Sequence, residues 1–300
     1  MFNYRLKQKQ NVMKKTEKLK NRLTQISKVN YDEGLFDAHK TGTPLDGLFS
    51  IDGGVPKATN WMVVGDPGVG KSTITLDIIA NAKKNGSKVL FISAEMNQVD
   101  LYLYVRRYPK FGDLDIFFPQ ELEEGDNPKN VLEDILSEGY DIVLIDSFIE
   151  LQEIIREECH MTRNSSEKYL LDLMYTHNLG SNKDKKFTSF LNIQQVNKSG
   201  VFTGSNKLKH MTTGMMEIRF VDENTQDERY VVFSKNRRGH VGKQMYFDLA
   251  AKGDVIYDTA RFKKTEKLKQ LKKAEKQKIK ESSKDFDKLF GLNQDTEDLS

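Results

Sequence analysis

The segment GDPGVGKS, residues 65 to 72, holds glycine, lysine and serine at the fixed positions of the pattern G-x-x-x-x-G-K-[ST]. Glycines at these positions let backbone N–H groups curl around phosphate oxygens. The Lys71 ammonium would reach the outer phosphates, and the Ser72 hydroxyl would ligate Mg²⁺. An apolar run precedes the segment and a helical pattern follows it, which is the context that the motif requires. It predicts a nucleoside triphosphate site formed by Gly65, Asp66, Pro67, Gly68, Val69, Gly70, Lys71, Ser72 and Thr73.

Two carboxylates end predicted strands. Asp146 ends YDIVLID, residues 140 to 146, where a carboxylate can hold Mg²⁺ through water. Glu95 ends KVLFISAE, residues 88 to 95, where it could act as general base toward the water that attacks a γ-phosphate. The plain alternatives are a strand-capping aspartate and a glutamate that complements a helix dipole.

Two further polar features at the ends of predicted strands are candidates for a functional role. Gln195 ends the apolar run 187 to 195, and its amide could sense a γ-phosphate; an ordinary polar strand end is the alternative. SKNRRG, residues 234 to 239, follows another apolar run, and it could hold nucleic acid, hold a phosphate or keep the surface soluble. Lys235 and Arg237 are two apart in a predicted strand, so both can point to one side.

The elements that must position these residues alternate along the chain. Nearly all predicted strands are apolar, which indicates an α/β fold with a mostly parallel sheet covered by helices on both faces. In such sheets ligands bind beyond the carboxyl ends of the strands. The predicted strands are 61–65, 88–95, 115–118, 140–146 and 187–195, then an antiparallel hairpin of 215–221 and 229–235 and a strand at 244–249. The predicted helices are 71–86, 99–108 with Asn97 as N-cap, 127–139, and a region after 146.

Composition limits the remaining possibilities. A chain of 300 residues with 37% hydrophobic content can bury one core of roughly 200 to 250 residues and carry extensions. No apolar run is long enough for a membrane span or a secretory signal, so we expect a cytoplasmic protein, in a bacterium or, if phage-encoded, in its host. Cys159 is the only cysteine, which excludes internal disulfides and any multi-cysteine zinc site.

Charge divides the chain into a body and two arms. Residues 1–28 carry nine Lys or Arg against one Glu, and residues 261–280 carry ten against two, so each has a net charge of +8. Residues 281–300 carry two against six, a net charge of −4. The two basic arms are either solvated segments or segments that bind nucleic acid phosphates. The acidic end could compete with nucleic acid for the basic surface or recruit a partner. We expect a basic arm at 1–30, one domain at 31–260, and a basic helix with an acidic tail at 261–300.

The motifs together resemble the RecA-like ATPases, and most closely the RadA/Sms ATPases of bacteria. The resemblance rests on TG…LD before GGVP, GDPGVGKST, ISAE, LIDS, the strand that ends in glutamine, and KNRRG, and it spans roughly residues 41 to 249. The RadA/Sms motif K-N-R-F-G is matched by Lys235, Asn236, Arg237, Arg238 and Gly239, with arginine in place of phenylalanine. GSNKLKHM, residues 204 to 211, is similar to the G-P-K-x-L-E-H-M of that family.

This resemblance implies ATP binding by residues 65 to 73, catalysis by Glu95 and coupling through Gln195. It also implies Mg²⁺ binding by Ser72 and Asp146. Lys235 and Arg237 would reach across a subunit interface to the γ-phosphate of the neighbour. The loop from 196 to 214 would face single-stranded DNA in the channel of a ring or filament, with phosphate contacts from Lys198, Lys207 and Lys209. A polar loop that merely carries lysines is the alternative.

The implied function is a DNA-dependent ATPase that acts on single-stranded or branched DNA in recombination, repair or replication. It would work as a homo-oligomer, a hexameric ring or a filament, with replication or recombination partners at its arms. The zinc ribbon and the Lon-protease-like domain of RadA/Sms proteins have no counterpart in this sequence, which suggests a reduced or phage-encoded relative. A DnaB-like helicase motor, whose family has a similar late K-x-R-x-G, and an ATP-switched protein that coats or anneals single strands without motor activity remain alternatives.

Overall fold

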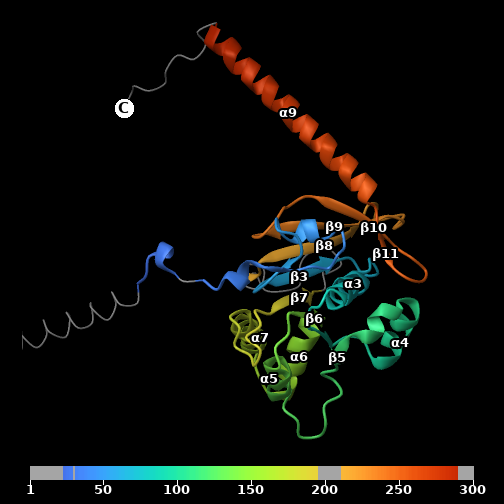
Figure 1. Ribbon diagram of the computed structural model, residues 1–300. Coiled ribbons are helices and arrows are strands. Elements are labelled where there is room, and N and C mark those ends of the chain that lie inside the picture. The colour runs from blue at the N-terminus through green and yellow to red at the C-terminus, as the bar shows by residue number, and fades with distance from the viewer. Residues whose placement is uncertain (1–22, 30, 195–210, 290–300) are drawn as a thin grey trace, which may run out of the picture. The chain divides into compact units, whose positions relative to one another are not determined.

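The computed structural model describes residues 23–29, 31–194 and 211–289, with the side chains at 280 and 283–289 left out of that description (Figure 1). The described residues fall into two compact units, one that ends at Phe36 and one that begins at Asp37. In the first, two 3-10 helices, η1 (Ile26–Lys28) and η2 (Glu33–Phe36), bury no residue. None of the helices in the described ranges has the length and apolarity needed to cross a membrane.

A mixed sheet organises the second unit. Within the described residues it has nine strands in the order β11-β10-β9-β8-β3-β7-β6-β4-β5. The six strands from β8 to β5 are parallel, whereas β9, β10 and β11 extend the sheet in antiparallel fashion. Their bounds are β3 Asn60–Gly65, β4 Val89–Ser93, β5 Asp115–Phe117, β6 Ile142–Asp146, β7 Ser189–Ile193, β8 Gly214–Phe220, β9 Arg229–Asn236, β10 Gln244–Leu249 and β11 Val255–Tyr257. The predicted mostly parallel sheet with a late antiparallel hairpin is confirmed.

Helices cover both faces of this sheet (Figure 1). Side chains alternate along each strand, so Trp61 and Val63 of β3 join one core cluster while Met62 and Val64 join the other. The first cluster includes α3 (Lys71–Lys84), with side chains of α4 (Gln98–Arg107) packed against it. The second includes α5 (Pro128–Ser137), α6 (Phe148–Glu158) and α7 (Arg163–Asn178).

Local sequence explains where several helices begin and end. The Asn97 side chain accepts hydrogen bonds from the backbone N–H groups of Val99 and Asp100 at 2.9 and 3.0 Å, which confirms it as the N-cap of α4. Asn127 caps α5 in the same way, and Pro128 follows as its first residue. After α3, Gly86 takes a left-handed φ of 94°, which ends the helix at little steric cost.

Residues 38–56 contain regular structure of their own, although the glycines and prolines of residues 41–56 indicate turns. Strand β1 (Ala38–His39) pairs with β2 (Val55–Pro56), and α2 (Asp46–Phe49) lies between them in sequence. The Asp46 carboxylate accepts hydrogen bonds from the backbone of Thr41 and Gly42, so it closes the turn that leads into α2. Phe49 packs edge-on against Trp61, which fixes α2 to the sheet.

Several predicted bounds were wrong by a few residues. β4 ends at Ser93, so Glu95 lies two residues beyond the strand that it was predicted to end. β9 ends at Asn236, one residue beyond the predicted bound, so Arg237 lies outside the strand along which it was expected to alternate with Asn236. The 3-10 helix η3 (Pro109–Asp113) and strand β11 were not predicted. The basic C-terminal helix, α9 (Thr259–Leu289), begins just before the predicted boundary at 261. The domain boundaries themselves stay predictions.

Candidate nucleotide site

Three parallel strands of the sheet, two of them adjacent and the third separated from these by β7, bring candidate residues to one edge. Lys71 follows β3, Glu95 follows β4, and Asp146 ends β6. The backbone N–H groups of Ala94 and Glu95 donate to the Asp146 carbonyl oxygen at 2.7 and 3.1 Å, which holds the segment after β4 against the end of β6. All three side chains line one cavity of about 500 Å³, together with the loop that follows β3. Residues that are far apart in sequence therefore meet at one cavity.

The glycines of this loop meet strict geometric demands. Gly68 and Gly70 have φ values of 74° and 100°, a region that other residues seldom adopt. A Cβ at Gly65 would lie 2.2 Å from the carbonyl oxygen of Ile218, so only glycine fits there. Gly70 is also the N-cap of α3, and it has no side chain that could occupy the N–H groups of the first turn. Those N–H groups and the helix dipole suit a phosphate.

Lys71 lies along the loop rather than away from it. Its Nζ donates to the carbonyl oxygens of Gly65 at 2.9 Å and Asp66 at 3.0 Å. Burial lowers the pKa of Lys71, and the nearby carboxylates of Asp146 and Glu95 act in the opposite direction. A half-buried ammonium held by carbonyl oxygens can exchange these partners for phosphate oxygens of higher charge.

Ser72 and Asp146 place two oxygen ligands side by side. Ser72 Oγ donates to Asp146 Oδ2 at 2.6 Å, and the Asp146 side chain is buried. Burial raises the pKa of Asp146 to about 6, although the Ser72 hydrogen bond lowers it. Hydroxyl and carboxylate oxygens are the ligands that Mg²⁺ prefers, with waters and substrate phosphates in its other positions. The residues present therefore fit a magnesium ion at the start of α3.

Lys235 and Arg237 do not belong to this cavity. β9 runs antiparallel to β8, and Asn236 at its end pairs with Gly214, the first residue of β8. Gly214 in turn pairs with Trp61, near the start of β3. These two cations therefore lie at the edge of the sheet where the parallel strands begin, whereas the loop after Gly65 lies at the edge where they end. Lys235 Nζ donates to the carbonyl oxygen of Thr212 at 2.6 Å.

Two residues of the KNRRG segment have structural roles that the sequence did not reveal. Asn236 Nδ2 donates to the carbonyl oxygens of Leu48 at 3.0 Å and Phe49 at 3.1 Å, which ties β9 to α2. A Cβ at Gly239 would lie 2.8 Å from the carbonyl oxygen of Phe49, so glycine is required for this close approach. The backbone carbonyl of Arg238 accepts a hydrogen bond from Ile51 at 3.3 Å. The segment is therefore anchored on the turn region that precedes β3.

Four predicted site residues lie outside the described residues. They are Gln195, which was predicted to couple nucleotide and DNA binding, and the three lysines of the DNA-facing loop, Lys198, Lys207 and Lys209.

Sequence reasoning missed an arginine that contacts the nucleotide loop. Arg219, on β8, lies 3.3 Å from Asp66 Oδ1 through Nη1 and 3.0 Å from Glu217 Oε2 through Nη2. Asp66 and Arg219 are 153 positions apart, and only the pairing of β3 with β8 brings them together. The one available signal was the position of Arg219 in a strand of the predicted hairpin.

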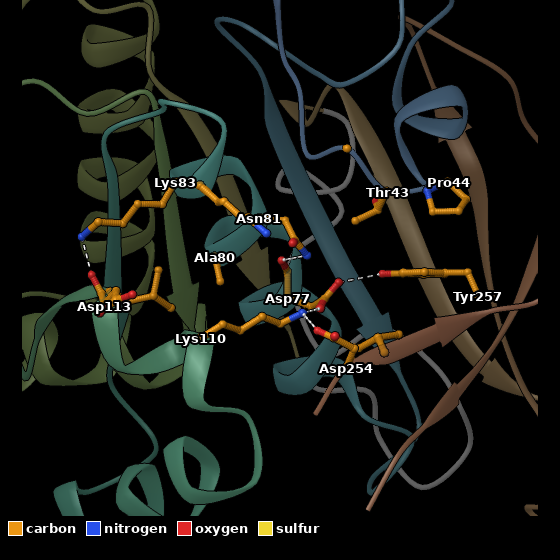
Figure 2. Close-up of a pocket in the computed structure, with 14 residues that line it drawn as sticks. Thr43, Pro44, Asp77, Ala80, Asn81, Lys83, Lys110, Asp113, Asp254 and Tyr257 are labelled. Atoms are coloured by element: carbon orange, nitrogen blue, oxygen red, sulfur yellow. Dashed lines mark hydrogen bonds and ion pairs between the residues drawn. The ribbon is translucent and has the colours of Figure 1, made fainter. Parts of the chain in front are cut away.

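A second cavity, of about 940 Å³, lies beside the later turns of α3 (Figure 2). At its centre the buried Asp77 carboxylate accepts hydrogen bonds from Lys110 and from the Tyr257 hydroxyl, the latter at 3.0 Å. Lys110 also pairs with Asp254 at 2.6 Å. We call these four residues the Asp77 clasp. Because the charged groups of the Asp77 clasp already pair with one another, we assign no ligand to this cavity.

Comparison with known proteins places this geometry in a family. The chain is 27% identical over 203 residues to the DNA repair protein RadA of Campylobacter jejuni, which covers 68% of this chain and 43% of that protein. It is 26% identical over 204 residues to the DNA repair protein RadA of Aquifex aeolicus, with 68% and 43% covered. The chain thus spans less than half the length of these relatives.

Solved structures show the same fold. A KaiC-like protein from Pyrococcus horikoshii superposes with a TM-score of 0.58 at 18% identity, over 74% of this chain and 99% of that one. The family model described as the RecA N-terminal domain matches residues 10–256, well over half of the sequence. The chain therefore belongs to the RecA N-terminal domain family, with an α/β RecA-like fold.

Proposed function

We propose that this protein is an ATP hydrolase of the RecA type. The observation that carries the proposal is the convergence of the glycine-rich loop, Glu95 and Asp146 on one cavity, at the carboxyl ends of the parallel strands β3, β4 and β6. Family membership supports the same conclusion. Residues 65 to 73 would bind the nucleotide, and Ser72 and Asp146 would hold Mg²⁺.

The chemistry follows from the groups on the cavity wall. Backbone N–H groups of the loop and the start of α3 would bind the phosphates, and Lys71 would move from its carbonyl partners to the outer phosphate oxygens. Mg²⁺ at Ser72 and Asp146 would neutralise charge on those oxygens. Glu95, exposed at the rim, would orient a water molecule and accept its proton. Its backbone bond to Asp146 keeps this carboxylate beside the metal ligand.

We further propose that hydrolysis depends on DNA, in recombination, repair or replication. The relatives named as DNA repair proteins support this. In this proposal Lys198, Lys207 and Lys209 contact single-stranded or branched DNA, and Gln195 couples that contact to the nucleotide. Lys235 and Arg237 would complete the site of a neighbouring subunit in a ring or filament, since their own cavity lies at the other edge of the sheet.

The decisive experiment measures ATPase rate with and without single-stranded DNA. We expect stimulation by DNA, no hydrolysis by Lys71→Ala, and a loss of roughly 100-fold or more in Glu95→Gln with nucleotide binding retained. Glu121→Gln, an exposed glutamate outside the cavity wall, is the matched control and should behave as wild type. Unchanged hydrolysis in Glu95→Gln would remove the general base from the proposal.

Strand-displacement assays separate the possible outputs of hydrolysis. Movement of a branch in a three-stranded substrate supports the RadA-like function. Unwinding of a fork alone supports a DnaB-like motor instead. Binding of single strands without either reaction supports an ATP-switched binding protein. An ATPase rate that is the same with and without DNA rejects the DNA dependence.

A further inference from the structure

The long C-terminal helix α9 (Figure 1) carries many positively charged, exposed side chains. Between residues 263 and 279 it has eight lysines against two glutamates, a net charge of +6. At 1.5 Å per residue this stretch is about 24 Å long. All eight lysine side chains are exposed: Lys263, Lys264, Lys267, Lys269, Lys272, Lys273, Lys276 and Lys278. The helix therefore presents a dense array of charge rather than scattered surface lysines.

The lysines form two rows on opposite sides of the helix. An α-helix turns by about 100° per residue. The mean direction of four of the lysines therefore lies about 180° around the helix axis from the mean direction of the other four. Row A is Lys269, Lys272, Lys273 and Lys276, and row B is Lys263, Lys264, Lys267 and Lys278. Between the rows, one flank holds Glu266, Gln270 and Gln277, and the other holds Glu275 and the exposed Leu268 and Ile279. Ala274 and the exposed Leu271 lie among the lysines of row B.

Neighbouring lysines within each row repel one another. Lys269 and Lys273 are four apart, as are Lys272 and Lys276, and such like-charged pairs destabilise a helix. Glu266 offsets part of this charge, at 3.4 Å from Lys269 and 4.0 Å from Lys243. Lys269 also donates to the Gly242 carbonyl oxygen at 3.2 Å, while about half of its side chain stays exposed. A polyanion that neutralised both rows would remove the repulsion and release its own counterions.

We propose that α9 binds duplex DNA by lying in the major groove, with each lysine row facing one of the two phosphate backbones that border the groove. The B-form major groove is about 12 Å wide and admits a helix, and its borders carry phosphates at regular spacing. The deep, narrow major groove of A-form RNA does not admit one. The exposed apolar residues of this stretch are Leu268, Leu271 and Ile279, a small apolar surface compared with the face that membrane-surface helices bury. The proposal adds a duplex contact to the proposed function and does not depend on the ATPase assignment.

The test measures the affinity of the full-length protein for a fluorescent duplex of about 30 base pairs across a salt series, by anisotropy. One variant replaces all four lysines of row A with glutamine, and a second does the same for row B. We expect each to lower the slope of log affinity against log salt by about 3 to 4, since each lysine neutralises one phosphate. Replacing row A with arginine keeps the charge and is the matched control, and its slope should stay as in wild type. Circular dichroism checks that α9 keeps its helicity.

Other outcomes overturn the proposal. If neither variant changes the slope of log affinity against log salt, α9 does not contact the duplex. If the glutamine variants lose as much affinity for duplex RNA or for single-stranded DNA as they lose for duplex DNA, groove binding is rejected. Loss of binding to phosphatidylserine vesicles with duplex binding intact assigns the helix to membranes. Basal ATPase should be the same in all variants, because none of these lysines lines the nucleotide cavity. If DNA does not stimulate the ATPase of the wild-type protein but the α9 variants still change the salt slope, the proposed DNA dependence is rejected and the duplex contact of α9 is supported.

Discussion

Arg219 joins the nucleotide loop to the neighbouring strand through charge, and Gly65 does so through close packing. The guanidinium lies between Asp66 and Glu217, with both carboxylates within 3.3 Å. One residue earlier on each strand, the Gly65 backbone lies so near the Ile218 carbonyl that no side chain would fit. The start of the loop is therefore held to β8 by two independent contacts. A hydrogen bond between charged, mostly buried groups typically contributes about 1.5 to 3 kcal/mol.

We predict that Arg219→Gln raises the KM for ATP by roughly 10-fold, which corresponds to about 1.4 kcal/mol, because Asp66 is no longer held in place. Asp66→Asn should have a similar effect, and the double variant should be no worse than either single one if Arg219 acts through Asp66. Steady-state kinetics that separate KM from kcat provide the measurement. Arg163→Gln, which removes an exposed arginine from α7, is the control. Additive losses would show that the two residues act separately.

At this scale the sequence reveals motifs whose residues are contiguous, and it does not reveal contacts between residues that are far apart in the chain. The loop from Gly65 to Ser72 was recognisable because all its fixed residues lie within eight positions. Asp146 and Glu95 were recognisable because each follows an apolar strand. The ion pair of Asp66 with Arg219 was not, since it depends on which strands become neighbours in the sheet. The roles of Asn236 and Gly239 were missed for the same reason: their partners are carbonyl groups of α2.

Among the elements, α3 is held by the Asp77 clasp. Asp77 is 1% exposed and touches residues from η3 and β11, so it links three segments (Figure 2). Burial raises the pKa of Asp77, whereas hydrogen bonds from Lys110 and Tyr257 oppose that rise. We predict that Asp77→Asn lowers the free energy of unfolding by about 2 kcal/mol, because Lys110 loses its buried partner. Urea unfolding of the full chain measures this.

Asp254→Asn is the control for that experiment. Asp254 contacts the same Lys110 ammonium, but its side chain is 73% exposed, so its loss should cost about 0.5 kcal/mol or less. Equal effects of the two substitutions would mean that burial of the ion pair is not what stabilises α3.

Strand β1 carries a pH-dependent contribution to stability. Burial lowers the pKa of His39 to about 4, from about 6.5 in an unfolded chain. The unfolded state therefore binds more protons between these values, and the stabilisation present above about pH 6.5 is lost as the pH falls toward 4. Between about pH 7 and about pH 4.5, wild type should lose about 2 kcal/mol more than His39→Gln. Urea titrations at both pH values test this, and equal losses would contradict it.

Long elements were predictable, whereas among the described strands of three residues or fewer only β5 was predicted. The apolar strands and the capped helices followed from periodicity and from Asn97 or Gly86 at their ends. β1 and β2 have two residues each and β11 has three, which is too short for any period to show. β1 pairs with β2, which begins 16 positions after β1 ends, and β11 pairs with β10, so these short strands are recognised only by their partners in the fold.

For the whole molecule, the separation of Lys235 and Arg237 from their own nucleotide cavity predicts that they act between subunits. Arg237→Ala and Lys71→Ala should each be inactive alone. Mixed, they should regain ATPase activity, because roughly a quarter of the interfaces would pair an intact loop with an intact Arg237. The rate of the mixture as a function of composition measures this.

Arg238→Ala is the matched control for the mixing experiment. Arg238 is the next residue, with its backbone bonded to Ile51, and its side-chain substitution should leave the rate near that of wild type. A mixture that stays inactive while oligomers form would show that Arg237 does not act across an interface.

The central place of β3 in the sheet also affects how the protein is made. β3 pairs with β7 and β8, whose residues lie 130 and 153 positions later in the chain. A ribosome adds roughly 5 to 20 residues per second, so β3 waits on the order of ten seconds for both neighbours. Until β8 emerges, an apolar strand edge is open to pairing with other chains. Chaperone demand during synthesis should therefore peak between the emergence of β3 and that of β8, and chains that end before residue 214 should aggregate.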